Sequence, residues 1–303
     1  MLIYPIGVTI SRILNNMIPL KTAHKNFVEH LKTNNRSEAT VIAYSKDVEQ
    51  LNDFLYKKGR NLVHEVILQD LVEYMKKLAT ESFTAKSISR KTNSTKTFFK
   101  YLKIEGHVET DPATELSHPK VDPKAPRILS KVEYRALRDA CKNDIRTLAI
   151  VELLLQTGIR IGELAKLKVS DISNGDSGKL KVPSLGTHQE REVPLNQAAQ
   201  KALRDYIHIR GEVKNDHLFV TKTGNPLLVR NIRATIDRFF RLAGIEGAKV
   251  NDLRHTFVAH HLREGANLVL ISKIAGHKRI STTEKYLEYV ERKGEEKTDL
   301  VEL

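Results

Sequence analysis

The sequence predicts a mainly α-helical protein of two domains: an N-terminal four-helix bundle and a mostly helical second domain that contains a small antiparallel sheet. Three observations lead to this prediction. The chain has 303 residues, about the length of two typical domains. Apolar residues recur at helical spacing over most of it. Three prolines within residues 117–127 exclude a helix there and favour an extended connector between the domains.

The first domain is expected over residues 20–116, after a tail at residues 1–19. Pro and Gly are almost absent from its interior, and Ser37 and Gly59 are suitable residues to begin and to end a helix. The apolar periodicity places four helices at residues 21–32, 37–58, 68–79 and 84–104. The short connections between these helices favour a compact bundle.

The second domain is expected over residues 128–303. It begins with helices at residues 130–141 and 145–157, and Gly158 ends the second of them. Short apolar stretches predict strands at residues 167–172, 179–182 and 191–195. Further helices are expected at residues 198–209, 229–243, 253–264, 268–274 and 282–290. The second domain is therefore a mixed one in which a small sheet lies among helices.

The composition favours a polyanionic partner. Fifty Lys and Arg against 37 Asp and Glu leave a net charge of +13. The lone cysteine, Cys141, excludes an internal disulfide and is expected to be a buried thiol in a reducing compartment. Residues 1–20 lack the pattern of a signal or anchor, so we expect a cytoplasmic protein with no membrane partner. The tail at residues 291–303 ends in apolar residues that either contact a neighbouring subunit or fray.

One stretch of the first domain is strongly basic. Between Lys86 and Lys103 there are six basic residues and no acidic one, with Ser and Thr among them. Such side chains can bind the phosphates of DNA, although a solvated helix face would show the same pattern. The candidate DNA-binding residues are Lys86, Arg90, Lys91, Lys96 and Lys100.

Three short stretches of the second domain contain candidate catalytic residues. Arg160 lies just after the helix end at Gly158. Arg254 lies in the first turn of a helix, where free backbone N–H groups also attract an anion. His277 follows a glycine that ends a helix, and Tyr286 lies nine residues further on. These stretches therefore offer two guanidinium groups, an imidazole and a phenol.

The same stretches do not predict a metal site. They lack the carboxylate cluster with which two-metal enzymes hold their ions. His255, His260 and His261 are not spaced as the zinc-binding pair on one face of a helix, and we interpret them as core or surface histidines. We therefore expect neither a metal nor a cofactor.

Together these residues resemble the tyrosine recombinase, or phage integrase, family, most closely its Xer-like members. Arg160 stands in Thr-Gly-Ile-Arg-Ile-Gly-Glu-Leu and Arg254 in Leu-Arg-His-Thr-Phe, and His277 and Tyr286 follow in the family's order and spacing. The resemblance covers the chain from about Leu20 onward. It implies a SAM-like core-binding domain and a catalytic domain. It also implies a site-specific recombinase of double-stranded DNA that forms a dimer on each site and a tetramer in synapsis, alone or paired with a related recombinase.

The resemblance also implies a role for each residue. Tyr286 attacks a DNA phosphodiester and forms a 3′-phosphotyrosyl intermediate, without metal or ATP. Arg160 and Arg254 bind the phosphate oxygens, and His277 donates to the same oxygens. Glu163 supports the site as a partner of Arg160. The biological task stays open among chromosome-dimer resolution, integration and transposon mobility.

Two positions depart from the family pattern. Asn251 stands where the family usually has a histidine, and an amide cannot shuttle a proton. Leu185 stands at the position of the lysine that protonates the leaving oxygen, and Lys181 and His188 are the candidates to replace it. These departures raise an alternative, a recombinase-derived DNA-binding or architectural protein with weakened catalysis. A topoisomerase that acts as a single subunit is a third interpretation.

Overall fold

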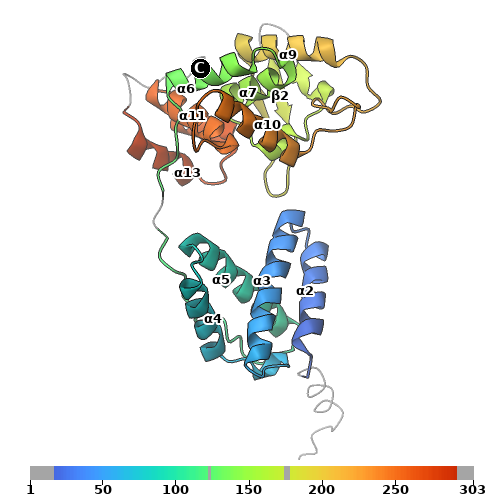
Figure 1. The fold of residues 1–303 in the computed structure, drawn as a ribbon, viewed down its shortest axis with the longest axis vertical. Coiled ribbons are helices and arrows are strands. Elements are labelled where there is room, and N and C mark those ends of the chain that lie inside the picture. Colours follow the sequence, from blue (N-terminus) through green and yellow to red (C-terminus); the bar gives the residue numbers. More distant parts are fainter. Residues whose placement is uncertain (1–16, 122–123, 174–177, 292–303) are drawn as a thin grey trace, which may run out of the picture. The chain divides into compact units, whose positions relative to one another are not determined.

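The computed structural model describes three stretches of the chain: residues 17–121, 124–173 and 178–291. The tails predicted at residues 1–19 and 291–303 lie almost wholly outside them. The chain divides into two compact units, residues 1–123 and 124–303 (Figure 1). Each unit has its own hydrophobic core. The predicted fold class, mainly helical with a small antiparallel sheet, is confirmed in the described stretches.

Within residues 17–121, the first unit is a bundle of four α-helices, as predicted. They are α2 (Leu20–Thr33), α3 (Glu38–Lys57), α4 (Leu68–Thr80) and α5 (Ala85–Ile104), with the 3₁₀ helix η1 (Val63–Glu65) between α3 and α4. Ser37 caps α3 by accepting a hydrogen bond from the Thr40 N–H at 3.2 Å. The core contains the fully buried rings of Phe27 and Phe98, which meet edge to face with centroids 5.2 Å apart.

One residue predicted to bind DNA is buried in this bundle. Lys91 is 2% exposed, and its Nζ donates to Asp47 Oδ1 at 3.0 Å. Arg90 donates to the other oxygen of the same carboxylate. The prediction is therefore wrong for Lys91, because its charge is neutralised inside the bundle. The other predicted residues of this group are at least partly exposed: Lys86, Arg90, Lys96 and Lys100.

In the second unit, further helices and a sheet surround one buried helix, α7. The helices are α6 (Lys131–Cys141), α7 (Ile145–Thr157), α8 (Ile161–Leu164), α9 (Gln197–Arg210), α10 (Val229–Leu242), α11 (Val250–Arg263), α12 (Leu268–Ala275), α13 (Ser281–Glu284) and the 3₁₀ helix η3 (Lys285–Tyr289). The strands are β1 (Ile172–Ser173), β2 (Lys179–Val182) and β3 (Arg191–Pro194). They form an antiparallel sheet in the order β1-β2-β3, with Leu180 opposite Val193. Cys141 is buried as predicted, and burial raises the pKa of its thiol to about 12.

Three predicted elements of this unit differ from the structure. The helix predicted at residues 253–264 begins earlier, at Val250, so Arg254 lies in its second turn and not in its first. Half of the strand predicted at residues 167–172 is a 3₁₀ helix, η2 (Val169–Asp171). The reason is that the Asp171 carboxylate accepts a hydrogen bond from the Lys168 N–H at 2.8 Å and so closes a turn. The helix predicted at residues 282–290 is divided into α13 and η3.

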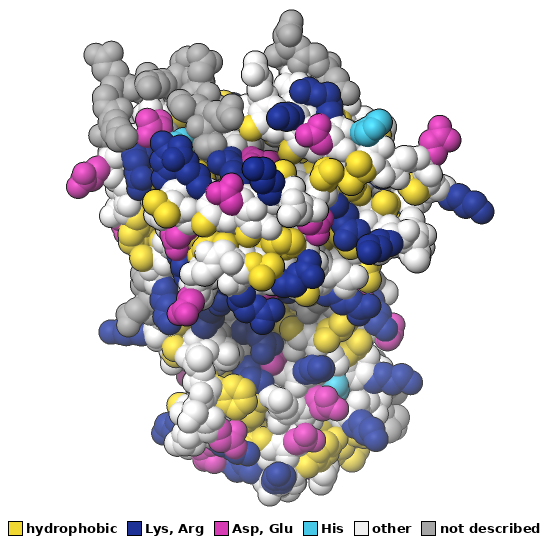
Figure 2. All heavy atoms as spheres, turned by 45° about the horizontal axis from the view of Figure 1, so that its top comes forward, with side chains coloured by type: hydrophobic (Ala, Val, Ile, Leu, Met, Phe, Trp, Pro, Cys, Tyr) yellow, Lys and Arg dark blue, Asp and Glu magenta, His cyan; other side chains and the backbone are white. Residues whose placement is uncertain are grey.

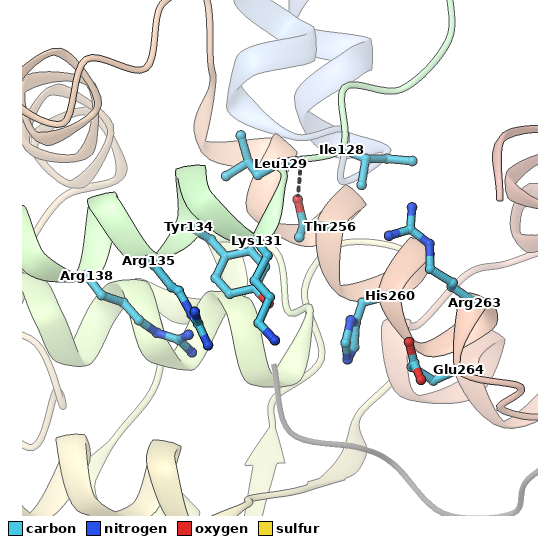
Figure 3. A pocket seen from close by; sticks show the side chains of 10 residues that line it. All are labelled: Ile128, Leu129, Lys131, Tyr134, Arg135, Arg138, Thr256, His260, Arg263 and Glu264. Carbon is cyan, nitrogen blue, oxygen red and sulfur yellow. Dashed lines mark hydrogen bonds between the residues drawn. The ribbon is translucent and has the colours of Figure 1, made fainter. Parts of the chain in front are cut away.

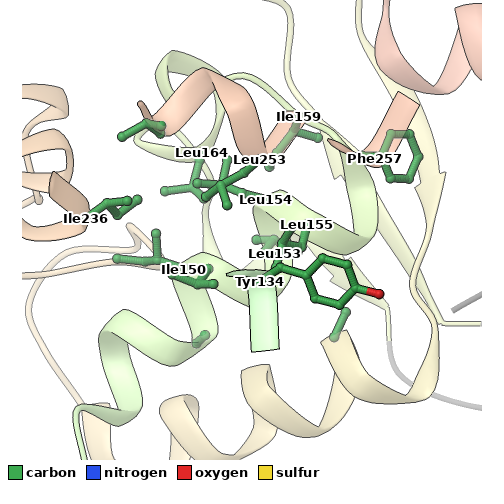
Figure 4. Packing of buried hydrophobic residues seen from close by; sticks show 14 of the residues in the cluster. Tyr134, Ile150, Leu153, Leu154, Leu155, Ile159, Leu164, Ile236, Leu253 and Phe257 are labelled. Atoms are coloured by element: carbon green, nitrogen blue, oxygen red, sulfur yellow. The ribbon is translucent and has the colours of Figure 1, made fainter. Parts of the chain in front are cut away.

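The end of α7 brings two candidate catalytic segments together. Leu153 and Leu154 of α7 lie in the same buried cluster as Leu253 and Phe257 of α11 (Figure 4). Helix α7 ends at Gly158, whose φ of +61° lies in the left-handed region that favours glycine. A Cβ at this position would overlap the Phe257 ring. Glycine therefore allows α11 to pack tightly against the end of α7.

The surface is rich in basic side chains. Lys and Arg cover more of the face drawn in Figure 2 than Asp and Glu do. This distribution agrees with the net charge of +13. In the described ranges, every helix is too short or too polar to cross a lipid bilayer.

Candidate active site

Arg160 is held between its own helix and the end of α12. Its backbone N–H donates to Glu163 Oε2 at 2.8 Å, and its Nη1 donates to Glu163 Oε1 at 3.1 Å. Its Nη2 donates to the carbonyl oxygen of Gly276 at 2.8 Å. The last carbonyls of a helix carry partial negative charge, so they stabilise a guanidinium at this place. Arg160 is therefore fixed in position before any ligand binds.

Arg254 of α11 lies beside Arg160 and is buried. Its side chain donates to the carbonyl oxygen of Gly158, at the end of α7. Burial and the repulsion of Arg160 lower the pKa of Arg254 to about 9, so the guanidinium still carries its charge at neutral pH. Two neighbouring guanidinium groups that are largely shielded from water repel each other, and an anion between them would relieve that repulsion.

Glu163 is the negative centre of the site. It is fully buried, and Arg191 at the start of β3 donates to both of its oxygens, each at 2.9 Å. Burial alone would raise the pKa of this carboxyl group, but the hydrogen bonds from Arg191 and from the Arg160 N–H outweigh burial and hold the pKa below its ordinary value. Glu163 therefore lies beside Arg160, as the resemblance implies, and it also binds a second arginine, Arg191.

Arg191 was not among the predicted site residues. Besides Glu163, it binds the Ile274 carbonyl oxygen through Nε at 2.7 Å. The neighbouring Gly276 has a φ of +66°, and a Cβ there would lie 2.8 Å from Arg191 Cζ. Gly276 therefore both ends α12 and leaves room for Arg191. The sequence alone contains no local signal for this contact, because Arg191 and Glu163 are 28 residues apart.

His277 lies in the turn between α12 and α13. Its Nδ1 forms a hydrogen bond with Thr283 Oγ1 at 2.7 Å, and its ring stacks on Tyr286 with centroids 6.4 Å apart. Burial, followed by the repulsion of Arg254 and Arg160, lowers the pKa of His277 to about 3. The imidazole is therefore neutral at physiological pH, and a neutral ring that still bears one N–H can donate one hydrogen bond.

Tyr286 lies in η3 and is 6% exposed. Its Oη is 2.5 Å from His255 Nδ1. Burial raises the pKa of the phenol, although Arg254 counteracts part of this effect. His255 is partly buried, and its ring contacts the candidate nucleophile, a contact that the interpretation as a core or surface histidine did not include. Its position four residues after Asn251, on the same face of α11, was the available signal.

The turn between β2 and β3 contains the candidate general acids. Leu185 and His188 exchange two backbone hydrogen bonds of 3.0 Å each, so Gly186 and Thr187 form the turn. Burial and the repulsion of Arg160 lower the pKa of His188, which indicates that His188 lies near the arginines. It also lines a cleft of about 650 Å³ that contains His277. The structure thus brings His188 to the site.

Lys181 and Leu185 lie differently. Lys181 is exposed on β2 and its Nζ is 3.2 Å from Glu190 Oε1. The Leu185 side chain lies against Gly162 of α8, where a Cβ on the glycine would be 3.1 Å from Leu185 Cδ2. The apolar side chain of Leu185 therefore packs on α8. The resemblance implies a lysine at this position of the turn.

A second cavity of about 460 Å³ lies between α6 and α11 and contains none of the predicted site residues. Figure 3 shows Lys131 and Arg135 of α6 opposite His260 of α11. The Leu129 N–H donates to Thr256 Oγ1 at 2.9 Å and ties the segment before α6 to α11. This cavity is separate from the cluster around Arg160 and Tyr286.

Most of the chain matches two known protein families. Residues 127–292 match the family described as "Phage integrase family", and residues 25–106 match "Phage integrase, N-terminal SAM-like domain". The chain therefore belongs to the phage integrase family of tyrosine site-specific recombinases.

Particular relatives are similar over most of the chain. Tyrosine recombinase XerC of Staphylococcus saprophyticus is 31% identical over 258 residues, which is 82% of this chain and 86% of that protein. A λ integrase dimer bound to a COC′ core site has a TM-score of 0.74 at 18% identity, over 93% of this chain and 81% of that one. A λ integrase tetramer bound to a Holliday junction has a TM-score of 0.72 at 17% identity, over 92% and 83%. At these identities the λ integrase structures show a shared fold.

Proposed function

We propose that the protein cuts and rejoins DNA at specific sites through a covalent 3′-phosphotyrosyl link to Tyr286. The observation that supports this proposal is the convergence of separate segments on one place. Arg160 from the α7–α8 corner, Arg254 from α11 and His277 from the turn after α12 interact with one another and with Tyr286. The cluster offers a nucleophile and a preorganised set of cations.

The reaction that fits these groups is a direct phosphoryl transfer. Tyr286 Oη attacks the phosphorus, a P–Oη bond forms, and the bond from phosphorus to the 5′ oxygen breaks. The freed 5′-hydroxyl of a partner strand then attacks the phosphotyrosyl link and releases Tyr286. Bond energy is retained in the link, so we expect no requirement for ATP. The negative charge that develops on the non-bridging oxygens is stabilised by side chains of this chain, and we expect no metal requirement.

The arginines and histidines have different roles in this reaction. Arg160 and Arg254 bind the non-bridging oxygens, and His277 donates its one N–H to the same oxygens. Glu163 and Arg191 keep Arg160 in place. The leaving 5′ oxygen needs a proton, and we propose His188 as its donor in preference to Lys181, because His188 lines the cleft beside His277.

DNA binding and assembly follow the same proposal. The exposed basic residues of α5, above all Lys86 and Lys100, would bind the phosphate backbone of a duplex. We propose two protomers on each site and four in synapsis, supplied by this chain or by a related recombinase. The λ integrase dimer and tetramer on DNA support this stoichiometry. The docking of the C-terminal tail on a neighbour and the cytoplasmic location stay predictions.

An alternative is a DNA-binding or architectural protein whose catalysis is weakened. Asn251 at a usual histidine position and Leu185 over α8 favour it. Loss of general-acid help alone slows a reaction by about 10²–10⁴-fold. The two functions therefore differ in the rate of cleavage and not in DNA affinity.

One experiment distinguishes the candidates. The binding site is first recovered by selection from a pool of random duplexes, and a duplex with a nick beside the cleavage position is then incubated with the protein and denatured. We expect a covalent protein–DNA adduct with the native chain and none with Tyr286→Phe, at equal DNA affinity. Absence of an adduct with the native chain would leave the architectural function. Relaxation of supercoiled DNA by a single subunit would instead indicate a topoisomerase.

A further inference from the structure

The phenol of Tyr286 must lose its proton when it attacks phosphorus. Burial raises the pKa of this group, so the neutral phenol dominates at physiological pH. A neutral phenol is a weak nucleophile until a base removes its proton. Asn251, at the position where the family usually has a histidine, cannot accept that proton. The chain therefore needs another acceptor within hydrogen-bonding distance of Oη.

His255 is the ring that meets this requirement. Its Nδ1 lies 2.5 Å from Tyr286 Oη, and the two ring centroids are 5.8 Å apart. The ring of His277 also lies beside Tyr286, but its Nδ1 is engaged with Thr283 Oγ1 at 2.7 Å. The contact of His255 is thus a hydrogen bond to the reacting oxygen itself, as a general base requires.

Asn251 contacts the other nitrogen of the same ring. Its Nδ2 lies 2.7 Å from His255 Nε2. An amide N–H₂ only donates, so in this arrangement Nε2 accepts and the ring proton lies on Nδ1, from which it donates to Tyr286 Oη. Half a turn of the amide would present Oδ1 to Nε2 instead. The ring proton then lies on Nε2, and Nδ1 is free to accept the phenolic proton.

We propose that His255 takes the phenolic proton of Tyr286 during cleavage and returns it during rejoining, and that Asn251 is the positioning residue that selects the ring tautomer through the orientation of its amide. In cleavage the P–Oη bond forms, the P–O5′ bond breaks, the proton moves from Oη to Nδ1, and O5′ takes a proton from His188. In rejoining the proton of the attacking 5′-hydroxyl moves to His188, and the proton on Nδ1 returns to Oη as Tyr286 leaves. The inference rests on the proposed recombinase function.

The surroundings of His255 suit a proton acceptor at neutral pH. Burial is the main cause that lowers its pKa, Arg254 lowers it further, and Asp252 raises it in part. The other groups that face the ring are Tyr286 from η3 and His277 from the turn after α12. The ring is therefore neutral at physiological pH and able to receive a proton.

The test is single-turnover cleavage of the nicked duplex over a range of pH. With the native chain we expect a fall in rate in acid, where His255 becomes protonated, and a second fall at higher pH, where His188 no longer carries the proton that it donates. His255→Ala and His255→Gln should each lower the rate by about 10²–10⁴-fold and remove the acid fall. Glutamine can still form a hydrogen bond with Tyr286 but cannot accept a proton. Free imidazole should partly restore cleavage by His255→Ala, with a rate that follows the concentration of unprotonated imidazole.

The positioning role of Asn251 has its own readout. Asn251→Asp should move the acid fall to higher pH, since a carboxylate beside Nε2 favours the protonated ring. Asn251→Ala should lower the rate less than His255→Ala does. His208→Ala, on the exposed face of α9, is the matched control and should keep the native rate and pH profile.

Each result has a defined meaning. If the native chain forms no adduct, the proposed function fails. If it forms an adduct and both His255 variants keep the native rate and pH profile, the proton-transfer role of His255 is refuted. Should His255→Ala fail to fold or to bind DNA, His255→Gln decides the matter alone.

Discussion

Each unit of the protein contains a buried carboxylate that binds basic side chains, and the two clusters differ in the charge they leave. In the bundle, Asp47 binds the buried Lys91 and the exposed Arg90, so the sum is +1. In the second unit, Glu163 binds Arg191 through both oxygens and Arg160 through one. Arg254 lies against the second cluster, so one carboxylate stands among three guanidinium groups and the sum is +2.

The difference shows that ion pairs of a buried carboxylate can either stabilise a fold or position the charges of a binding site. The carboxylate of Asp47 stabilises the bundle and neutralises the buried Lys91, whose charge would otherwise be available to DNA. A carboxylate outnumbered by arginines fixes their positions and leaves positive charge unbalanced. A phosphodiester can supply the negative charge that the second cluster lacks.

The largest effects should come from removal of either carboxylate. Asp47→Ala leaves the buried Lys91 without its carboxylate, and Glu163→Ala does the same to the partly buried Arg160 and Arg191, which costs about 3–5 kcal/mol of stability. Hydrogen exchange measured by mass spectrometry can assign this loss to a unit. We expect reduced protection only in the bundle for Asp47→Ala and only in the second unit for Glu163→Ala. Unchanged protection in both variants would mean that the ion pairs do not stabilise the fold.

Replacement of the arginines separates charge from geometry. Arg160→Lys and Arg254→Lys keep the positive charge but lose the planar pair of donors, and each should slow cleavage by about 10²–10³-fold. Single-turnover cleavage measures this effect. Arg135→Lys, in the separate cavity of Figure 3, is the control and should keep the native rate. Equal rates for all three variants would show that bidentate binding is unimportant.

The two candidates for the general acid should respond differently. His188→Ala should slow cleavage by about 10²-fold or more. A substrate with sulfur in place of the 5′ bridging oxygen should rescue this variant, because a thiolate leaves without a proton. Lys181→Ala should keep the native rate, since Lys181 is exposed and paired with Glu190. A slow Lys181→Ala variant rescued by the sulfur substrate would transfer the role to Lys181.

Glu163 should also make stability depend on pH. Its pKa in the folded protein lies below the ordinary value, so its contribution is complete above about pH 5 and is lost as the pH falls through the folded-state pKa. Denaturant unfolding of the native chain and of Glu163→Gln at a series of pH values measures this. The variant should be less stable at pH 7, and the gap should narrow in acid. A constant gap would argue against an ionised Glu163.

The smallest expected effect concerns the basic residues of α5. Lys100→Ala should weaken DNA binding and reduce the slope of log affinity against log salt by about 0.9, the value for one phosphate contact. Lys91→Met should leave that slope unchanged, because Lys91 is buried against Asp47. A reduced slope for Lys91→Met would mean that the ion pair opens on DNA.

Much of the fold follows from local sequence signals. The four helices of the bundle end within one residue of their predicted limits, because apolar periodicity and caps such as Ser37 act within a turn or two. The same holds for α7, which ends before Gly158. The strand predicted at residues 167–172 failed for a local reason too, since the Asp171 carboxylate favours a 3₁₀ turn.

The site could be predicted only where its residues stand in recognisable motifs. Arg191 stands in none, and its partner Glu163 is 28 residues away. The sequence predicts that Lys91 is available to DNA, because the stretch around it contains no acidic residue. Its actual partner, Asp47, lies 44 residues earlier. His255 was visible but had no assigned contact until the fold brought Tyr286, 31 residues later, against its ring. Long-range contacts of this kind are set by packing and not by local pattern.

The most direct test of the account identifies the residue that becomes joined to DNA. The adduct formed on the nicked duplex is digested with nuclease and protease, and the modified peptide is sequenced by mass spectrometry. We expect one peptide, with a nucleotide attached through its 3′ phosphate to Tyr286. A nucleotide attached to any other residue, or through a 5′ phosphate, would refute cleavage by Tyr286.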